Sequence, residues 1–269
     1  MFEPITIVTA LYDINREIDG DGRKFQEYLS WFKKTLKVTR PMVIFVDDSL
    51  VSFVEECRKN LPTKIIAQPI EKIPYYHLTE SINQIIQSQN FKSKIGAPER
   101  VECKMGLYNS VIYSKFQWIK QTILENPFDT ELFMWMDAGL SRFFYEIDLN
   151  YPSNNAIDVL MDYKDHVIIQ TSMSYYSDLV QAPKYTQEHL WDARTWVMAG
   201  LWCGGKKVMI KFCDLIDDVL NNKMISNNLI NNEQSAMAYV YKNNPDMFVA
   251  FENYADKHRP YEFIQELSK

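Results

Sequence analysis

The chain has 269 residues, of which 46% are hydrophobic and 14% aromatic, and no linker rich in Pro, Gly or Ser divides it. This composition predicts one domain with a sizeable core. The formal net charge of -6 and the lack of a basic run exclude nucleic acid as an expected partner, because such binding needs clustered cations. The cysteines are scattered without zinc-site spacing and are expected to be small buried side chains.

The N-terminus and the length of the apolar segments indicate where in the cell the protein is expected. No N-terminal stretch resembles a signal peptide, and no apolar segment approaches the roughly 20 residues that span a bilayer. We therefore expect a cytoplasmic protein with no transmembrane segment, peripheral to a membrane at most.

Strand and helix patterns alternate along the first half of the chain. Strands are predicted at 5–10, 42–46, 64–67 and 132–136, and helices at 25–38, from Ser49 onward, and at 107–124. This alternation is typical of an α/β fold with a mostly parallel central sheet flanked by helices. The second half is less regular. Its strands are predicted at 166–170 and 247–251 and its helices at 207–220 and 232–242.

The most informative segment is the apolar run 132–136, which ends abruptly in Asp137 and Gly139. A strand that is apolar at every position is typical of a sheet covered by helices on both faces. Open sheets of this kind bind ligands at the carboxyl ends of their strands. Asp137 is therefore expected to hold a metal ion or a polar substrate. The alternative is that it only ends a turn.

Polar residues follow two other predicted strands. They are Thr9, Tyr12, Asp13 and Arg16 after the first strand, and Asp47 after the second. We expect at least two of these strand ends, including that of Asp137, to share a site. The alternative is that each group is ordinary loop chemistry.

Lys115 breaks the pattern of its predicted helix. Its neighbours three and four positions away are all apolar: Val111, Ile112, Trp118 and Ile119. The charged residue therefore falls on the packing face. Either its stem carries the ammonium to the surface or the ammonium meets an anion, and we favour an anionic ligand.

Three common signatures are missing from the sequence. There is no glycine-rich phosphate loop, no G-x-G-x-x-G after the first strand, and no Ser in a nucleophile elbow. ATPase, dehydrogenase and serine hydrolase functions are therefore not expected. A bound phosphate is expected to be met by a divalent cation and isolated basic side chains.

Three segments of the chain resemble the HtrL/YibB family, also called WlaTB/HtrL, of proposed glycosyltransferases. They are Ile5 through Ile14, Ser114-Lys115-Phe116, and Asn126-Pro127-Phe128 through Asp137-Ala138-Gly139. The resemblance implies a single GT-A-like domain over 1–269, with a nucleotide-binding half at 1–145 and an acceptor-binding half at 146–269. It also implies transfer of a sugar from a nucleoside diphosphate sugar, preferably a UDP-sugar, to a saccharide or other hydroxyl acceptor.

The same resemblance implies roles for individual residues. The donor-binding positions are Thr9, Ala10, Tyr12, Asp13, Arg16, Asp47, Lys115, Met136, Asp137 and Gly139. The loop 199–205 is expected to bind the acceptor through Trp202, Gly204 and Gly205, unless its glycines only form a turn. Glu233 is expected to be the general base, unless it is only a favourable charge in the first turn of a helix. If Gln234 faces the anomeric carbon instead, a retaining mechanism is favoured.

The implied metal site departs from the usual GT-A pattern. Such enzymes usually carry Asp-x-Asp at this strand end, whereas this chain reads Asp137-Ala138-Gly139. One possibility is that Asp137 holds a divalent cation, Mn²⁺ or Mg²⁺, with His258 as a second ligand. The other is that the enzyme is metal-independent. Two rival functions stay open. One is a nucleotidyltransferase acting on sugar phosphates, and the other is a catalytically inactive nucleotide-sugar-binding protein.

Overall fold

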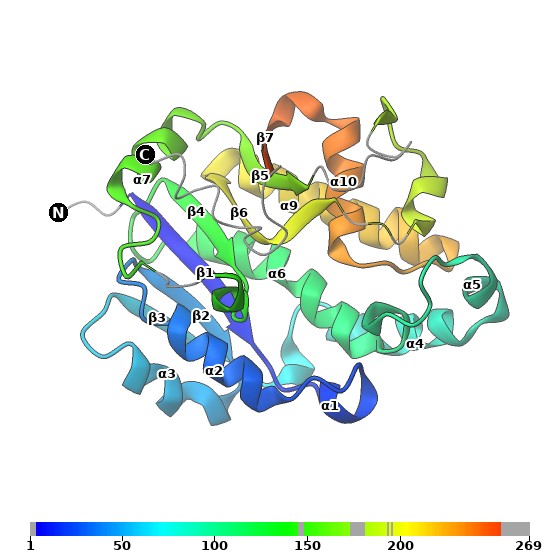
Figure 1. Cartoon of the computed structure of the whole chain (residues 1–269), viewed down its shortest axis with the longest axis horizontal. Helices are drawn as coiled ribbons and strands as arrows, with labels where there is room; N and C mark the ends of the chain where they lie inside the picture. The colour runs from blue at the N-terminus through cyan, green and yellow to red at the C-terminus, as the bar shows by residue number, and fades with distance from the viewer. Residues whose placement is uncertain (1–3, 145–147, 173–180, 193, 195, 254–269) are drawn as a thin grey trace.

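The computed structural model describes residues 4–144, 148–172, 181–192, 194 and 196–253 (Figure 1). Within these residues one seven-stranded sheet has the strand order β3-β2-β1-β4-β6-β5-β7. Its strands are β1 (Ile5–Leu11), β2 (Met42–Val46), β3 (Thr63–Ala67), β4 (Leu132–Met136), β5 (Val167–Ser172), β6 (Val197–Gly205) and β7 (Phe248–Asn253). Neighbouring strands are parallel except where β6 pairs with β4 and β5. The predicted α/β fold with a mostly parallel sheet is confirmed.

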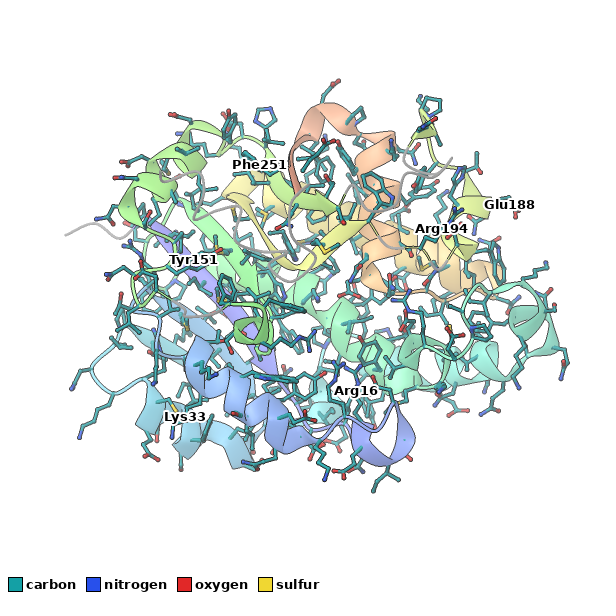
Figure 2. The ribbon with its side chains drawn as sticks, in the orientation of Figure 1. Arg16, Lys33, Tyr151, Glu188, Arg194 and Phe251 are labelled. Atoms are coloured by element: carbon teal, nitrogen blue, oxygen red, sulfur yellow. The ribbon has the colours of Figure 1, made fainter. Side chains whose placement is uncertain are left out.

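Helices cover both faces of the sheet, and their side chains form two core layers (Figure 2). One layer lies under α2 (Phe25–Thr35), α3 (Val51–Cys57) and α7 (Asn154–Asp162). The other lies under α4 (Thr79–Gln87), α5 (Gln89–Lys94), α6 (Gly106–Glu125), α9 (Lys206–Asp218) and α10 (Glu233–Asn243). The short helix α1 (Arg16–Asp19) follows β1.

Strand β4 shows why its sequence is apolar throughout. Phe133 and Trp135 belong to the layer under α6, while Met134 and Met136 belong to the layer under α2. Side chains alternate along a strand, so a strand between two helical layers needs an apolar residue at every position. By the same alternation Asp137 comes to the α6 side of the sheet.

The segment 199–205, which the sequence analysis expected to be an acceptor-binding loop, is part of strand β6. This expectation is wrong for Trp202, whose fully buried ring stacks on Phe116 with 5.1 Å between ring centres. It is also wrong for Gly204 and Gly205, because a Cβ on either would lie within 2.7 Å of a backbone oxygen near the start of β5. The glycines serve close packing of backbone against backbone.

Two further expectations concern membranes and cysteines. In the part of the chain that is described, no helix combines the length and the apolar character needed to cross a membrane. Cys103, Cys203 and Cys213 are buried, as expected, and Cys57 is half-buried; all four are free thiols.

Candidate functional site

A cavity of about 550 Å³ opens at the carboxyl ends of β1 and β4, beside α6 and the start of α10. Open α/β sheets bind ligands in this position. The residues proposed from the sequence that line it are Ala10, Tyr12, Asp13, Arg16, Lys115, Asp137, Gly139, Glu233 and Gln234. The ends of the first strand and of the Asp137 strand therefore meet at one cavity, and the roles of these residues stay predictions.

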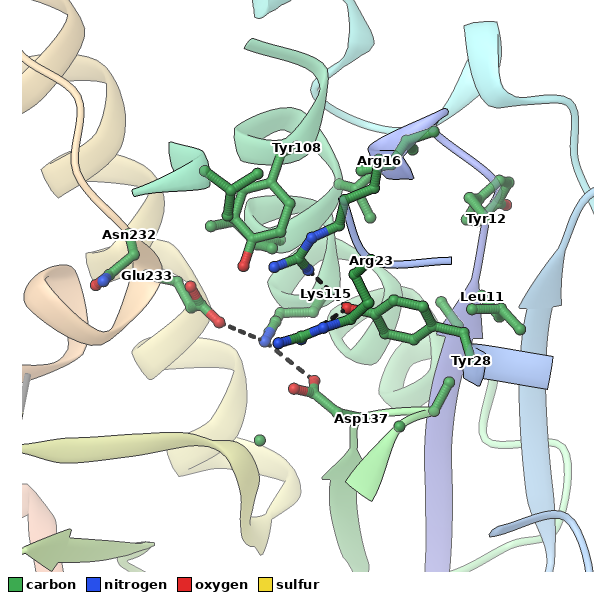
Figure 3. A pocket seen from close by; sticks show the side chains of 18 of the residues that line it. Leu11, Tyr12, Arg16, Arg23, Tyr28, Tyr108, Lys115, Asp137, Asn232 and Glu233 are labelled. Atoms are coloured by element: carbon green, nitrogen blue, oxygen red, sulfur yellow. Dashed lines mark hydrogen bonds and ion pairs between the residues drawn. The ribbon is translucent and has the colours of Figure 1, made fainter. Parts of the chain in front are cut away.

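The ammonium of Lys115 lies on the floor of this cavity (Figure 3). It donates to Oε1 of Glu233 at 2.7 Å, to Oδ1 of Asp137 at 3.2 Å and to the carbonyl oxygen of Ala199 at 3.4 Å. The lysine side chain is only 3% exposed, so the ammonium does not reach the surface. It meets anions, as its place on an apolar helix face indicated, but these anions are protein carboxylates. We call Lys115, Asp137 and Glu233 the buried triad.

Asp137 occupies the open side of the buried triad. Its backbone N–H donates to the carbonyl oxygen of Gly200 on β6 at 2.9 Å. Its Oδ1 accepts a hydrogen bond from the indole N–H of Trp135 at 2.6 Å. Trp135 and Asp137 are two positions apart on an extended chain and therefore share one face. Because the Asp137 side chain is 43% exposed, it is the member of the triad most accessible to a ligand.

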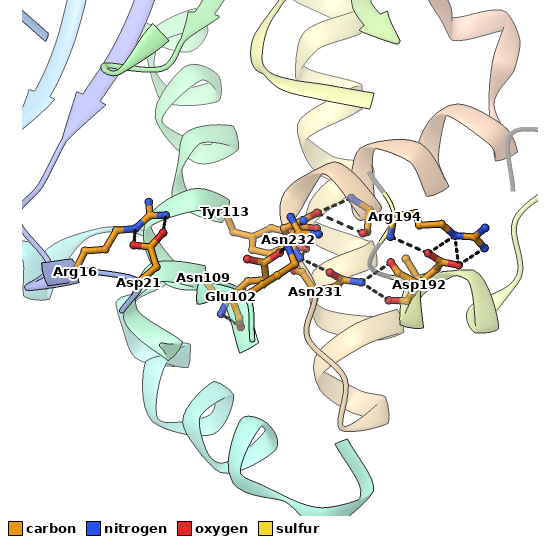
Figure 4. Close-up of polar contacts among 12 residues, drawn as sticks. Arg16, Asp21, Glu102, Asn109, Tyr113, Asp192, Arg194, Asn231 and Asn232 are labelled. Carbon is orange, nitrogen blue, oxygen red and sulfur yellow. Dashed lines mark hydrogen bonds and ion pairs between the residues drawn. The ribbon is translucent and has the colours of Figure 1, made fainter. Parts of the chain in front are cut away.

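Glu233 is positioned by the first turn of α10. The side chain of Asn232 caps this helix and also donates to Oε1 of Glu102 at 3.0 Å (Figure 4). Tyr113 on α6 donates to the carbonyl oxygen of Asn232 at 3.2 Å. These contacts join the start of α10 to α6, and so hold Glu233 against Lys115.

The buried triad has one ammonium for two carboxylates, and this arrangement shifts the pKa values of Lys115 and Glu233. Burial raises the pKa of Glu233 above its ordinary 4.5, and the charge of Asp137 adds to this, although Lys115 opposes it. Burial alone would lower the pKa of Lys115, but the two carboxylates raise it above 10.5. One ammonium can neutralise only one of the two carboxylates, so ionising the second one in a buried site costs free energy. Glu233 therefore holds a proton more readily than an ordinary glutamate, which is typical of enzymatic acids and bases.

A second group of charges lies at the mouth of the cavity. This arginine rim consists of Arg16, Arg23 and Arg142. Arg16 forms a two-point ion pair with Asp21, at 2.7 Å for both contacts, and donates to the hydroxyl of Tyr28 at 2.6 Å. Arg23 donates to the same hydroxyl at 3.3 Å. The guanidinium of Arg142 lies over the ring of Trp31, 5.2 Å from its centre.

Several residues proposed from the sequence do not line the cavity: Thr9, Asp47, Met136, Trp202, Gly204 and Gly205. Thr9 and Met136 are fully buried, and alternation turns them away from the α6 side of the sheet. Asp47 accepts a hydrogen bond from the backbone N–H of Ser49 at 3.1 Å and caps the turn after β2. The expected direct contact of Thr9 and Met136 with a donor is therefore corrected, whereas that of Asp47, whose charge acts on Tyr12 at the cavity, stays a prediction.

Gly204 and Gly205 lie far from the buried triad because of the direction of strand β6. Because β6 is antiparallel to β4, Gly205 pairs with Leu132 and Gly204 with Phe133. These pairs are at the opposite end of β4 from Asp137, roughly 13 Å away at the rise of an extended strand. Gly200, at the near end of this part of β6, lines the cavity instead.

The residues near Asp137 do not fit the expected divalent cation. Hard cations take several oxygen ligands, mostly carboxylates and carbonyls. Among the described residues no group of three or more Asp, Glu, His or Cys could hold a metal ion. Oδ1 of Asp137 already accepts from Lys115 and Trp135, and an adjacent ammonium repels a second cation. The other proposed ligand, His258, lies outside the described residues.

Sequence reasoning missed some residues that the structure brings to the cavity. Tyr108, whose ring centre lies 4.9 Å from the Arg16 guanidinium, precedes Lys115 by two helical turns. Helical spacing could have placed these two on one face. Arg23 and Glu102 lie outside the regular helices and strands, so no periodic pattern points to them.

Comparison with protein families identifies the chain. Residues 3–261 match the model of HtrL/YibB, described as bacterial proteins of unknown function. The chain belongs to the HtrL/YibB family. The resemblance seen in three sequence segments is therefore confirmed over nearly the whole chain. No curated protein matches the sequence.

Solved structures give more distant likenesses. The apo form of mouse xyloside xylosyltransferase 1 has 8% identity and a TM-score of 0.49, covering 92% of this chain and 85% of that one. The 4-diphosphocytidyl-2C-methyl-D-erythritol synthase from Anaerococcus prevotii DSM 20548 has 8% identity and a TM-score of 0.44, covering 100% and 98%. At such distance the chemistry of this HtrL/YibB protein has to be argued from its own residues.

Proposed function

We propose that this HtrL/YibB protein is a GT-A-like glycosyltransferase, which moves a sugar from a nucleoside diphosphate sugar to an acceptor hydroxyl. The observation that carries the proposal is the buried triad, which presents two carboxylates to a cavity at the carboxyl ends of parallel strands. Carboxylates at this position suit a polar, hydroxyl-rich substrate and a step that needs a base.

The nucleoside end of the donor lies, in this proposal, along the end of β1. Ala10, Tyr12 and Asp13 line the cavity there. The hydroxyl of Tyr12 is buried and has no hydrogen-bond partner among the described residues. A buried polar group is usually satisfied, so a hydroxyl or carbonyl of the nucleoside suits this position. The Tyr12 ring is held by stacking on Trp118, 5.5 Å between centres.

The reacting centre is assigned to the triad. Glu233 takes the proton of the acceptor hydroxyl as that oxygen bonds to the anomeric carbon, and the diphosphate leaves with the electrons of the broken bond. Asp137, the exposed member, accepts hydrogen bonds from sugar hydroxyls. Lys115 positions both carboxylates through its two ion pairs. Gln234 also lines the cavity, and a product of retained configuration would assign it the place at the anomeric carbon instead.

The two proposed halves of the domain both contribute to this cavity. The nucleotide-binding half, 1–145, supplies the ends of β1 and β4 together with α6, whereas the acceptor-binding half, 146–269, supplies Gly200 and the start of α10. We propose that the donor lies mainly against the first half and that the acceptor enters from the second. A saccharide or another hydroxyl compound then meets Glu233 at the boundary.

The proposal is tested by incubating the protein with a panel of nucleoside diphosphate sugars and measuring nucleoside diphosphate release, with and without saccharide acceptors. We expect release from at least one donor, and a rate about 10² to 10⁴ lower in Glu233→Gln, the usual effect of losing a general base. Donor affinity should stay within about twofold, because Glu233 faces the acceptor and not the diphosphate.

The matched control is Glu131→Gln, which removes an acid paired with Lys206 at the start of β4, outside the cavity. It should turn over donor as the wild type does. Release of pyrophosphate from a nucleoside triphosphate and a sugar phosphate would instead show a nucleotidyltransferase. Donor binding with no turnover would show a binding protein, and either result would overturn the proposal.

A further inference from the structure

The arginine rim gathers three guanidinium groups around two aromatic rings. Arg16 and Arg23 both donate to the hydroxyl oxygen of Tyr28, so two cations converge on one neutral acceptor. Tyr28 packs edge-on against Trp31, 5.3 Å between ring centres, and Arg142 lies over Trp31. Like charges repel unless an anion lies among them, so this convergence points to an anionic ligand.

The charges of the rim are only partly balanced by the protein. Asp21 pairs with Arg16, and the arginines, Arg16 foremost, lower its pKa to about 2. Arg23 also acts on Asp21, although less than Arg16 does, and Arg142 contacts aromatic rings. The rim therefore has three guanidinium groups around one carboxylate, which leaves two positive charges in excess. The two phosphate groups of a nucleoside diphosphate sugar each carry a negative charge and would neutralise them.

The rim lies beside the strand end that carries Asp137. A Cβ on Gly139 would lie 3.4 Å from the Trp31 ring and 3.5 Å from that of Tyr28, so the turn after β4 packs directly on the aromatic pair. Arg16 and Arg23 extend toward Lys115 and Asp137 (Figure 3). The rim and the buried triad are thus two ends of one cavity, with opposite net charge.

The guanidinium groups of the arginine rim are better phosphate ligands than the side chains of the buried triad. Their planar forks of N–H donors match pairs of phosphate oxygens, and stacking on an aromatic ring leaves the N–H edges free. The triad, with an excess of carboxylate, repels phosphate and suits neutral hydroxyls. We propose that the arginine rim binds the donor diphosphate without a divalent metal, while the triad faces the sugar. This inference rests on the proposed function for the identity of the diphosphate as part of a sugar donor.

The test is calorimetric titration with inorganic pyrophosphate and with UDP, first in EDTA and then in Mn²⁺, in low-salt buffer. We expect both to bind in EDTA, with affinity changed less than threefold by Mn²⁺. Arg142→Gln and Arg23→Gln should each weaken binding about tenfold, the effect of losing one charge-assisted contact at a partly exposed site. Arg142→Lys should recover part of the loss, since it keeps the charge and loses the fork.

The matched control is Lys33→Gln, which removes one exposed positive charge outside the cavity from α2, the helix that carries Tyr28 and Trp31. It should bind pyrophosphate as the wild type does, and thermal melting of each variant shows that it is folded. Binding only in Mn²⁺, or equal binding by folded Arg23→Gln and Arg142→Gln, would overturn the inference. These readouts need no turnover, so metal-free binding with no sugar transfer would count against the proposed function alone. Transfer that requires Mn²⁺ would count against the inference alone.

Discussion

The buried triad and the arginine rim hold charge in contrasting surroundings. The triad has two carboxylates for one ammonium, and Lys115 and Glu233 are almost fully enclosed. The rim has three guanidinium groups for one carboxylate, Asp21, and its side chains rest on aromatic faces, with Arg142 exposed. A buried charge needs a partner to be tolerated, whereas a charge at the surface is stabilised by water. The triad is therefore expected to matter to folding and the rim mainly to binding.

Removing one cation from each region should have the most unequal effects. Lys115→Met should lower the free energy of unfolding by about 3 kcal/mol, because it leaves the buried carboxylate of Glu233 without its ammonium and beside the charge of Asp137. Arg142→Gln should change it by less than about 0.5 kcal/mol, as is usual for exposed positions. Urea unfolding of the two variants makes the measurement. Equal losses would show that the triad is not the structural element that its burial suggests.

The pH dependence of Glu233 gives the second largest effect. A general base must be ionised, so turnover should fall about tenfold per pH unit below the raised pKa, with a midpoint above 4.5. The folded protein also holds this proton more tightly than the unfolded chain. The contribution of Glu233 to the free energy of unfolding should therefore decrease as pH rises from 4.5 through the raised pKa.

Glu233→Gln serves as the control for this titration, because its amide carries no proton to lose in this range. Urea unfolding gives the free energy of unfolding of the variant and of the wild type at each pH between about pH 4 and pH 8. The difference between the two free energies should change with pH. The wild type should lose stability relative to the variant toward high pH. A difference with the opposite sign would mean that Lys115 outweighs burial and lowers the pKa of Glu233.

The smallest effect concerns how Asp137 is held. Trp135→Phe removes the indole N–H that donates to Oδ1 of Asp137 at 2.6 Å and should cost about 1 kcal/mol more than Trp202→Phe. The two changes remove the same volume from buried rings, but the Trp202 N–H has no partner to lose among the described residues. The difference between the free energies of unfolding of the two variants, measured in urea, gives the contribution of the hydrogen bond. Equal costs would show that the indole N–H of Trp135 does not help to position Asp137.

Most of the fold could be predicted from local patterns. The apolar runs of β1, β2 and β4 and the helical spacing of α2 and α6 are found within a few residues of where they were expected. Helices α4, α5 and α7 were not predicted, and neither was strand β6, in which glycines suggested a loop. Those glycines are required because neighbouring backbone approaches within 2.7 Å of where a Cβ would lie, a contact made by residues distant in sequence.

The candidate site was only partly predictable. Lys115 was identified because a lysine on an apolar helix face needs an anion, a rule that depends on helical spacing alone. Its partners could not be derived in the same way, because Glu233 is 118 positions away. Thr9 and Met136 were misassigned although alternation could have excluded them, since each faces the side of the sheet opposite Trp135 and Asp137.

Local patterns along the chain predicted most of the strands, the helices α2 and α6, and the burial of one lysine, because each of these depends on neighbours within a few positions. The match over residues 3–261 gives the HtrL/YibB family. Which charges meet depends instead on the tertiary structure. The packing of α10 on α6 brings Glu233 to Lys115, and the packing of the turn after β4 on Tyr28 and Trp31 brings the arginine rim to the same cavity. Electrostatic energy depends on distances in space and on burial, and neither follows from spacing along the chain.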